Sequence, residues 1–458
     1  MLAAAALVGT PGAAAAAGSG DTHRTVTATA DSAPRADVTL LDLIQTEFGY
    51  TTITDNYYRN VSPQVLLDGA RTGIVAYLRG RGIADPTVGF MHARADGRFA
   101  VPAIEQQIGR AIERYGARVD VHDLVAATIE GELGALHDPY SVLFSKSELA
   151  KFTTALDGRA FGGIGAELAY DDAQKAWLID EVFPESPAAA AGVREHDVLV
   201  AVDGVTVGTL DVDAISAKLR GPAGSRVALT IARDGAHLPV PLALTRAVIT
   251  PPDVSRRAIE PGIGYVALRT FGPNAGRDTR AALLWLIARG ANKIVFDLRG
   301  NGGGYESAAV DVASCFVRGP VVSMIARGGK RIVTSAKGTP VPLGGLVVLV
   351  DGDSASGSEL VTGAIRDHHA GTIVGTRTFG KGLVQAMFPL PDGSAIKLTT
   401  ARYFTPAGED IDRVGILPDD VIAEPADAPH GVVGSDPQLD RAIARLLTPV
   451  RPASAARP

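Results

Sequence analysis

The stretch that decides the fold is LVVLVDGDSASGSELVTGAI, residues 346–365. It opens with an apolar run from Leu346 to Val350, which has the length and composition of a buried strand. A loop of Asp, Gly and Ser follows, and from Ser358 apolar residues recur at helical spacing. A buried strand that turns directly into an amphipathic helix predicts a layered α/β fold.

Similar strand and helix patterns surround this unit and place an α/β core at residues 248–425. The predicted strands are 264–269, 293–298, 346–350 and 372–375, and the predicted helices are 279–289 and 358–367. For the segment 426–458 we predict one helix, with Pro437 in its first turn, and a disordered tail.

Two regions with different secondary-structure patterns precede the core. Residues 36–158 have mainly helical periodicity, and 79–120 within them resemble an insertion to which the sequence assigns no role. Residues 159–247 contain short β-like runs separated by Gly, Asp and Pro, with one helix at 212–219. The predicted class is therefore a multidomain α+β and α/β protein.

Composition excludes several functions. The chain has 458 residues, 46% of them hydrophobic, and a net charge of −6 with scattered basic residues. This argues against nucleic acid and anionic membranes as partners. The single cysteine, Cys315, excludes an internal disulfide and a cysteine zinc cage, and no His-Glu-x-x-His motif is present. We expect neither a metal nor another cofactor.

The first residues indicate export. Residues 1–17 are nearly all Ala, Leu, Val and Gly, and the small residues Ala15 to Ala17 precede Gly18, as in a secretory signal and its cleavage site. We predict a leader and linker over 1–35 and a periplasmic or extracellular location. An Ala-rich leader without signal function is the alternative, because no charged residue opens the segment. The chain has no apolar stretch suited to a stable membrane span.

The loop after the central strand carries a candidate nucleophile, Ser356. Functional groups in open α/β sheets lie at the carboxyl ends of strands, so a Ser at this strand-to-helix turn is exposed. The N–H of Gly357 can then point at an oxyanion. The competing interpretation is helix capping, for which Ser is equally suited.

The candidate base is Lys381, which lies between two glycines in Thr378-Phe379-Gly380-Lys381-Gly382. Burial lowers the pKa of a lysine and makes its amine a usable base near neutral pH. Gln385, four residues later, is placed to orient that amine.

A glycine loop ends the predicted strand 293–298. Its residues Gly302, Gly303 and Gly304 expose consecutive N–H groups, which can bind an anion or a developing oxyanion. A dinucleotide-binding loop is the rival interpretation, but the Gly-x-Gly-x-x-Gly spacing is absent.

In combination these motifs resemble the carboxyl-terminal processing peptidases, or tail-specific proteases. The segments that carry the resemblance are 354–359, 378–385, 138–141, 161–165, 403–408 and 415–419. The resemblance implies a crotonase-like α/β protease core over 248–425. It also implies that Ser356 is the nucleophile, Lys381 the general base and Gln385 its positioning residue. Gly357 and the Gly302–Gly304 loop would supply the oxyanion N–H groups.

The same resemblance identifies 159–247 as a PDZ domain. It implies that Gly163, Ile164 and Gly165 form a loop whose N–H groups hold the C-terminal carboxylate of a protein or peptide substrate. We expect Ile164 and Leu168 to line an apolar pocket beside it. An adaptor protein and self-association are left open. The chain departs from the family pattern at His196, Gly357 and Gly302, but no departure removes a catalytic group.

Two other functions compete with a serine endopeptidase. An inert PDZ scaffold with a degenerate core is disfavoured because Ser356, Lys381 and Gln385 are all present. An acyl-CoA enzyme of the crotonase type would leave the PDZ domain unexplained, and the sequence shows no CoA or nucleotide motif.

Overall fold

The computed structural model describes residues 38–94, 97–156, 161–171, 174–183, 185–233, 235–237, 241–250, 252–423 and 430–448. The predicted leader and the tail beyond 448 lie outside these ranges. Within them, no helix has the length and apolar character needed to cross a bilayer.

A six-stranded sheet organises the core, in the order β11-β12-β13-β16-β17-β20. The five strands from β12 to β20 run parallel, and β11 pairs antiparallel at one edge. The strands are β11 (Val254–Glu260), β12 (Ile263–Leu268), β13 (Lys293–Asp297), β16 (Gly345–Val350), β17 (Thr372–Gly375) and β20 (Asp420–Val421). Because they are parallel, the loops that follow β13, β16 and β17 meet at one edge.

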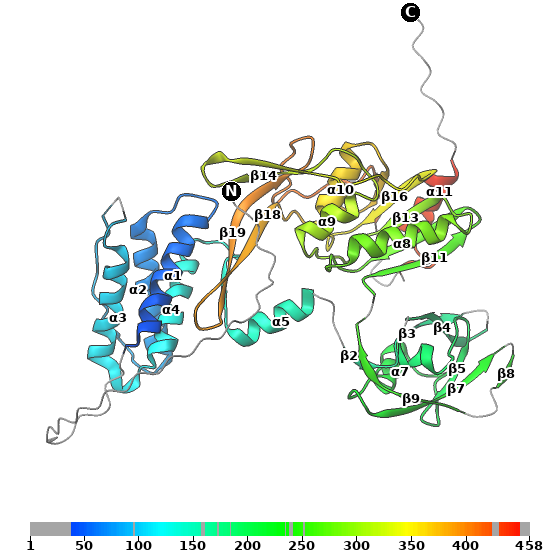
Figure 1. Ribbon diagram of the computed structural model, residues 1–458, viewed down its shortest axis with the longest axis horizontal. Helices are drawn as coiled ribbons and strands as arrows, with labels where there is room; N and C mark the ends of the chain where they lie inside the picture. Colours follow the sequence, from blue (N-terminus) through cyan, green and yellow to red (C-terminus); the bar gives the residue numbers. More distant parts are fainter. Residues whose placement is uncertain are drawn as a thin grey trace, which may run out of the picture.

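Helices cover both faces of this sheet (Figure 1). They are α8 (Ala275–Ile287), α9 (Glu306–Ala313) and α10 (Gly357–Asp367) on one face and α11 (Pro437–Leu447) on the other. Alternation along β16 follows this division: Val348 and Val350 pack with α8, α9 and α10, and Val347 and Leu349 pack with α11. A strand buried on both faces has no polar side, which explains its continuous apolar run.

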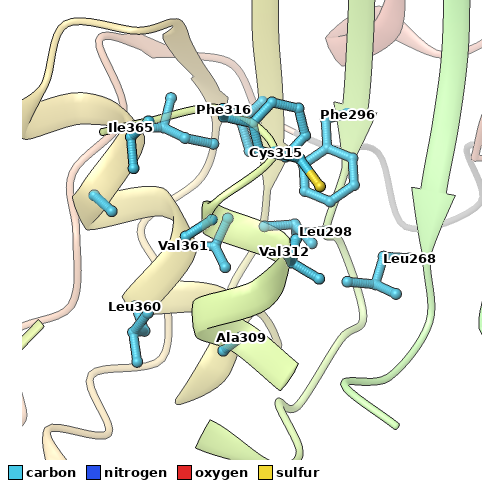
Figure 2. Packing of buried hydrophobic residues seen from close by; sticks show 14 of the residues in the cluster. Leu268, Phe296, Leu298, Ala309, Val312, Cys315, Phe316, Leu360, Val361 and Ile365 are labelled. Atoms are coloured by element: carbon cyan, nitrogen blue, oxygen red, sulfur yellow. The ribbon is translucent and has the colours of Figure 1, made fainter. Parts of the chain in front are cut away.

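Figure 2 shows the packing between α9, α10 and the sheet. Cys315 lies there among Phe296, Phe316 and Ile365, fully buried. Burial raises the pKa of its thiol to about 11. Cys315 is therefore a small core residue with an inert thiol.

A second, antiparallel sheet links the core to the N-terminal region, in the order β1-β19-β14-β15 with β18 beside β19. Its strands are β1 (Val142–Phe144), β14 (Pro320–Ala326), β15 (Arg331–Ser335), β18 (Leu383–Pro389) and β19 (Ala395–Phe404). The sequence patterns did not predict this sheet. Ile396 and Leu398 of β19 pack into the helical bundle of the N-terminal region, so the two regions share a hydrophobic core.

The N-terminal region is helical, as predicted. Its helices are α1 (Leu40–Asn56), α2 (Pro63–Gly80), α3 (Ala100–Tyr115), α4 (Val121–Gly134) and α5 (Lys146–Leu156), with a 3₁₀ turn η1 (Gly116–Arg118) after α3. The segment 79–120 supplies α3, which buries Ile104 and Ile108 in the bundle. Helices α2 and α4 approach closely at Gly73 and Gly131: a Cβ on Gly73 would lie 1.9 Å from the Ala127 carbonyl oxygen.

The β-rich region forms a separate lobe around a seven-stranded sheet, with β3 at one edge (Figure 1). Its strands are β3 (Ala166–Asp171), β4 (Ala176–Val182), β5 (Val198–Val202), β6 (Val205–Thr206), β7 (Arg226–Arg233), β8 (Ala236–His237) and β9 (Leu242–Thr245), and its helices are α6 (Pro187–Ala190) and α7 (Val212–Leu219). The strands β2 (Phe161–Gly163) and β10 (Ala247–Ile249) pair antiparallel, which brings the beginning and the end of the β-rich region together.

Candidate active site

The three loops that leave β13, β16 and β17 carry the glycine loop, Ser356 and Lys381 respectively. All three border one cavity of about 430 Å³. Its lining includes Thr270, Gly302, Gly303, Gly304, Tyr305, Glu306, Ser356, Gly357, Lys381, Gln385, Lys397 and Tyr403. The sequence-predicted residues of the core, which are up to 83 positions apart in the chain, therefore lie around a single space.

Of the three serines between β16 and the first turn of α10, only Ser356 lines the cavity. Ser354 and Ser358 are fully buried, and their hydroxyls donate to the carbonyl oxygens of Leu298 (2.8 Å) and Asn301 (2.7 Å). Ser356 occupies the N-cap position of α10 with φ 54° and ψ −108°. A positive φ is uncommon for a residue with a Cβ, so the surrounding contacts must hold this turn.

Glu359 provides those contacts. Its carboxylate is fully buried and accepts four hydrogen bonds. Oε2 accepts the backbone N–H groups of Ser356 and Lys381, each at 2.9 Å, and Oε1 accepts the Thr378 hydroxyl (2.6 Å) and the Gly380 N–H (2.7 Å). One oxygen thus fixes the separation of the Ser356 and Lys381 backbones. The sequence analysis did not identify Glu359 as a site residue. In the sequence it is only an acidic residue in the first turn of a predicted helix, where such residues are common.

The glycine loop is packed against the Ser356 turn. Gly303 has φ 101°, and a Cβ at this position would lie 2.9 Å from the Gly357 nitrogen. The N–H of Gly303 donates to Asn301 Oδ1 at 2.9 Å. Within the described part of the chain, the N–H groups of Gly302, Gly304 and Gly357 have no protein acceptor. These three remain available for an anion.

Lys381 is half-buried, with its Nζ 5.0 Å from the centre of the Tyr140 ring. Burial lowers the pKa of its amine, and the nearby charge of Lys397 lowers it further; Glu359 and Asp138 act in the opposite direction. A lowered pKa makes the neutral amine available as a base near neutral pH. Gln385 also lines the cavity, and its Nε2 donates to Thr399 Oγ1 at 3.4 Å.

A second cavity, of about 280 Å³, lies in the β-rich lobe beside the edge strand β3. It is bordered by Gly163, Ile164, Gly165 and Leu168, the residues predicted to bind a peptide terminus. Ile164 is itself almost fully buried in the core of the lobe.

Charged side chains that the sequence did not single out also border this second cavity. They are Glu167, Arg220 and Arg269. Arg269 follows β12 in the α/β core and forms an ion pair with Glu167 of β3, so the groove contains a residue from outside the lobe.

Within the described ranges, no cluster of His, Cys, Asp and Glu could hold a metal ion. An α/β core with a serine at a strained strand-to-helix turn, a half-buried lysine and free N–H groups around one cavity is typical of a serine-type peptidase. The second lobe has the edge strand and glycine loop of a peptide-binding domain.

Comparison with known proteins agrees with both features. Residues 262–422 match the model of peptidase family S41, and residues 178–233 match that of the PDZ domain. The chain belongs to the carboxyl-terminal processing proteases of family S41, a family of serine-type peptidases. The predicted fold class, a multidomain protein with an N-terminal helical region, a PDZ domain and an α/β protease core, is thereby confirmed.

Several relatives are named as carboxyl-terminal processing proteases or peptidases. The carboxyl-terminal-processing protease of Synechocystis sp. is 35% identical over 302 residues, which cover 65% of this chain and 70% of the relative. The chloroplastic C-terminal processing peptidase of Tetradesmus obliquus is 37% identical over 326 residues, covering 66% and 70%. A solved photosystem II D1 C-terminal processing protease is 30% identical and covers 86% of this chain and 95% of that one, with a TM-score of 0.47.

Proposed function

We propose that the chain is a serine endopeptidase that uses a Ser356/Lys381 dyad. One observation carries this proposal: a single cavity is bordered by Ser356, Lys381, Gln385 and free backbone N–H groups, with the two dyad backbones held by one Glu359 oxygen. A nucleophile, a base and an oxyanion site in one cavity are what acyl transfer requires.

In the proposed reaction, Ser356 Oγ attacks the scissile carbonyl carbon while its proton passes to the neutral amine of Lys381. The N–H of Gly357 and the free N–H groups of Gly302 and Gly304 stabilise the resulting oxyanion. The Gly303 N–H is less suited because Asn301 already accepts it.

When the tetrahedral intermediate collapses, Lys381 returns the proton to the leaving amine and an acyl-Ser356 ester remains. Water then attacks this ester with Lys381 as base, which releases the new carboxyl terminus and restores the serine. Because Gln385 uses its Nε2 toward Thr399, its Oε1 is left to accept a hydrogen bond from Lys381.

The first prediction tests the dyad. Ser356→Ala and Lys381→Ala should each lower the cleavage rate of an unfolded protein such as casein by at least about 10³-fold, and the double variant should lower it little further, because the residues act as a unit. Ser354→Ala is the matched control: its hydroxyl lies outside the cavity, donates to Leu298 and accepts the Asp351 N–H, so we expect a stability loss of about 1–3 kcal/mol with most activity retained. An inactive Ser354→Ala beside an active Ser356→Ala would refute the assignment. Full activity of both dyad variants would refute the dyad, whereas no cleavage by the native protein would favour an inert core with a peptide-binding role.

We further propose that the PDZ groove selects substrates by their C-terminal tails. A tail would add to the edge strand β3, with its carboxylate on the N–H groups of Gly163–Gly165 and its last side chain against Leu168. The groove is small and partly apolar, so small or apolar terminal residues should be preferred.

The second prediction concerns this tail. Matched peptides with a free C-terminal carboxylate and with a C-terminal amide differ in one charge. Loss of hydrogen bonds to a charged group costs about 1–3 kcal/mol, so the full-length enzyme should cleave the acid roughly 10- to 100-fold more efficiently at low substrate concentration. Equal rates for the two peptides would show that the groove does not read the tail.

The export prediction concerns residues outside the described ranges and stays a prediction from the sequence. Relatives from cyanobacteria and chloroplasts are processing proteases, which is consistent with it. Adaptor binding and self-association likewise stay predictions.

A further inference from the structure

The active-site cavity contains a second lysine, Lys397 of β19. In the sheet it lies opposite Val142 on one side and Met387 on the other. Its neighbours Ile396 and Leu398 point into the helical bundle, so alternation along the strand directs Lys397 to the opposite face, into the cavity. The cavity therefore contains two amines.

The two amines have different surroundings. Lys397 Nζ lies 5.3 Å from the ring centre of Phe144 and 5.1 Å from that of Phe152. Two aromatic faces favour the charged form of an amine through cation–π attraction. Lys381 Nζ has one such face, from Tyr140. Burial also lowers the pKa of Lys397. Because two like charges in one cavity disfavour each other, only the better stabilised charge is retained, and the two aromatic faces assign it to Lys397.

Other ionisable groups surround the pair. The carboxylates are Asp138, before β1, Glu359 of α10, Glu306 of α9 and Asp412, and the remaining groups are Tyr140, Tyr403 and Arg413. Within the described residues, neither lysine forms an ion pair. Glu359 already accepts four hydrogen bonds, and Asp138 accepts the Tyr140 N–H and the Ser141 hydroxyl. Among the described residues, none of these carboxylates forms an ion pair with either amine, and Asp138 favours the charged form of both at longer range.

We propose that Lys397 is a positioning residue for the reaction: it carries the ammonium charge of the cavity and thereby keeps the Lys381 amine neutral and ready to accept the Ser356 proton. This inference rests on the proposed dyad. Burial and the Lys397 charge both lower the pKa of Lys381. The aromatic pair of Phe144 and Phe152 holds the charge beside the dyad, and no described carboxylate forms an ion pair with it.

The pH profile tests this role. In Lys397→Met, a side chain of similar length without charge, the pKa of Lys381 should rise. The acid limb of kcat should then move up by about one pH unit, with a roughly tenfold lower rate at pH 7 that recovers at higher pH. Lys397→Arg keeps the charge and should keep the profile. Lys330→Met, at an exposed lysine, is the control and should change nothing.

An unchanged acid limb in Lys397→Met would overturn the proposal, as would a loss of rate that is equal at every pH. If Lys381→Ala retained activity, the dyad itself would be wrong. If only the role proposed for Lys397 is wrong, Lys381→Ala is still inactive. This outcome therefore differs from a failure of the dyad, in which Lys381→Ala would keep its activity.

A second measurement does not depend on catalysis. In the Ser356→Ala enzyme with ¹³C at the lysine side chains, NMR titration gives the order in which the two amines lose their protons, and Lys→Arg changes assign the signals. The proposal requires Lys381 to titrate first, at lower pH. Prior deprotonation of Lys397 would overturn it.

Discussion

Two glutamates in different regions of the molecule are equally buried but differ in the hydrogen bonds that their carboxyl groups accept. Glu359 in the α/β core and Glu132 on α4 of the helical bundle each have at most 1% of their surface exposed. Glu359 accepts four hydrogen bonds, whereas neither carboxyl oxygen of Glu132 has a hydrogen-bond partner among the described residues. Burial raises the pKa of Glu132 well above its usual value.

The difference shows that burial of the same residue type has opposite consequences, depending on whether hydrogen-bond donors surround the carboxyl group. A buried charge is tolerated where donors converge on it, and the Ser356 and Lys381 loops provide them. The helices around Glu132 have their backbone N–H groups in internal hydrogen bonds, and no described donor pairs with its carboxyl, so burial favours the neutral form. The first carboxylate organises the site, and the second lowers the stability of the bundle.

Replacing the organising carboxylate should have the larger effect. Glu359→Gln puts an amide NH₂ against N–H donors in either orientation, because both oxygens accept. We expect a loss of about 2–4 kcal/mol in the free energy of unfolding and a fall of about 10²-fold in cleavage rate as the two loops shift. Urea unfolding and casein cleavage measure the two effects, with the exposed Glu47→Gln as control. Unchanged activity would show that the loops hold their positions without Glu359.

The same substitution in the bundle should have the opposite sign. Glu132→Gln cannot ionise in the unfolded chain, and Glu132→Leu also removes the unpaired oxygens. We therefore expect Glu132→Leu to stabilise the protein by about 1–3 kcal/mol at pH 7, with a smaller gain for Gln and unchanged cleavage. A stability loss in both variants would mean that Glu132 has a partner that hydrogen-bonds its carboxyl.

The pH dependence sharpens this test. Since the folded pKa of Glu132 lies above the unfolded value, its contribution to stability is fully present below pH ~4.3 and is lost as the pH rises through the folded pKa. The advantage of Glu132→Gln over the native chain should thus be near zero at pH 4 and grow by up to about 1.4 kcal/mol per pH unit above it. An advantage independent of pH would contradict the buried, neutral state.

Elements with a single periodicity could be predicted from the sequence. The predicted strand 372–375 coincides with β17, and the predicted helix 212–219 coincides with α7. The β18–β19 hairpin was missed because β19 packs one face on the helical bundle and the other on the cavity, which removes the polar alternation of an exposed strand. Its pairing with β1, across some 250 residues, leaves no local pattern.

By itself, the sequence determined the strand-to-helix unit at 346–365, the helical and β-rich regions before it, and the candidates Ser356, Lys381 and Gln385, because apolar periodicity and glycine loops are local properties. The candidates Gly163–Gly165 came from the family resemblance of short motifs. Only the tertiary structure decided that Ser354 and Ser358 turn away from the cavity, that Glu359 joins the loops of Ser356 and Lys381, and that Lys397 lines the same cavity. These depend on which groups meet after the chain folds, and in the sequence a glutamate or lysine that becomes buried looks the same as one that stays in water.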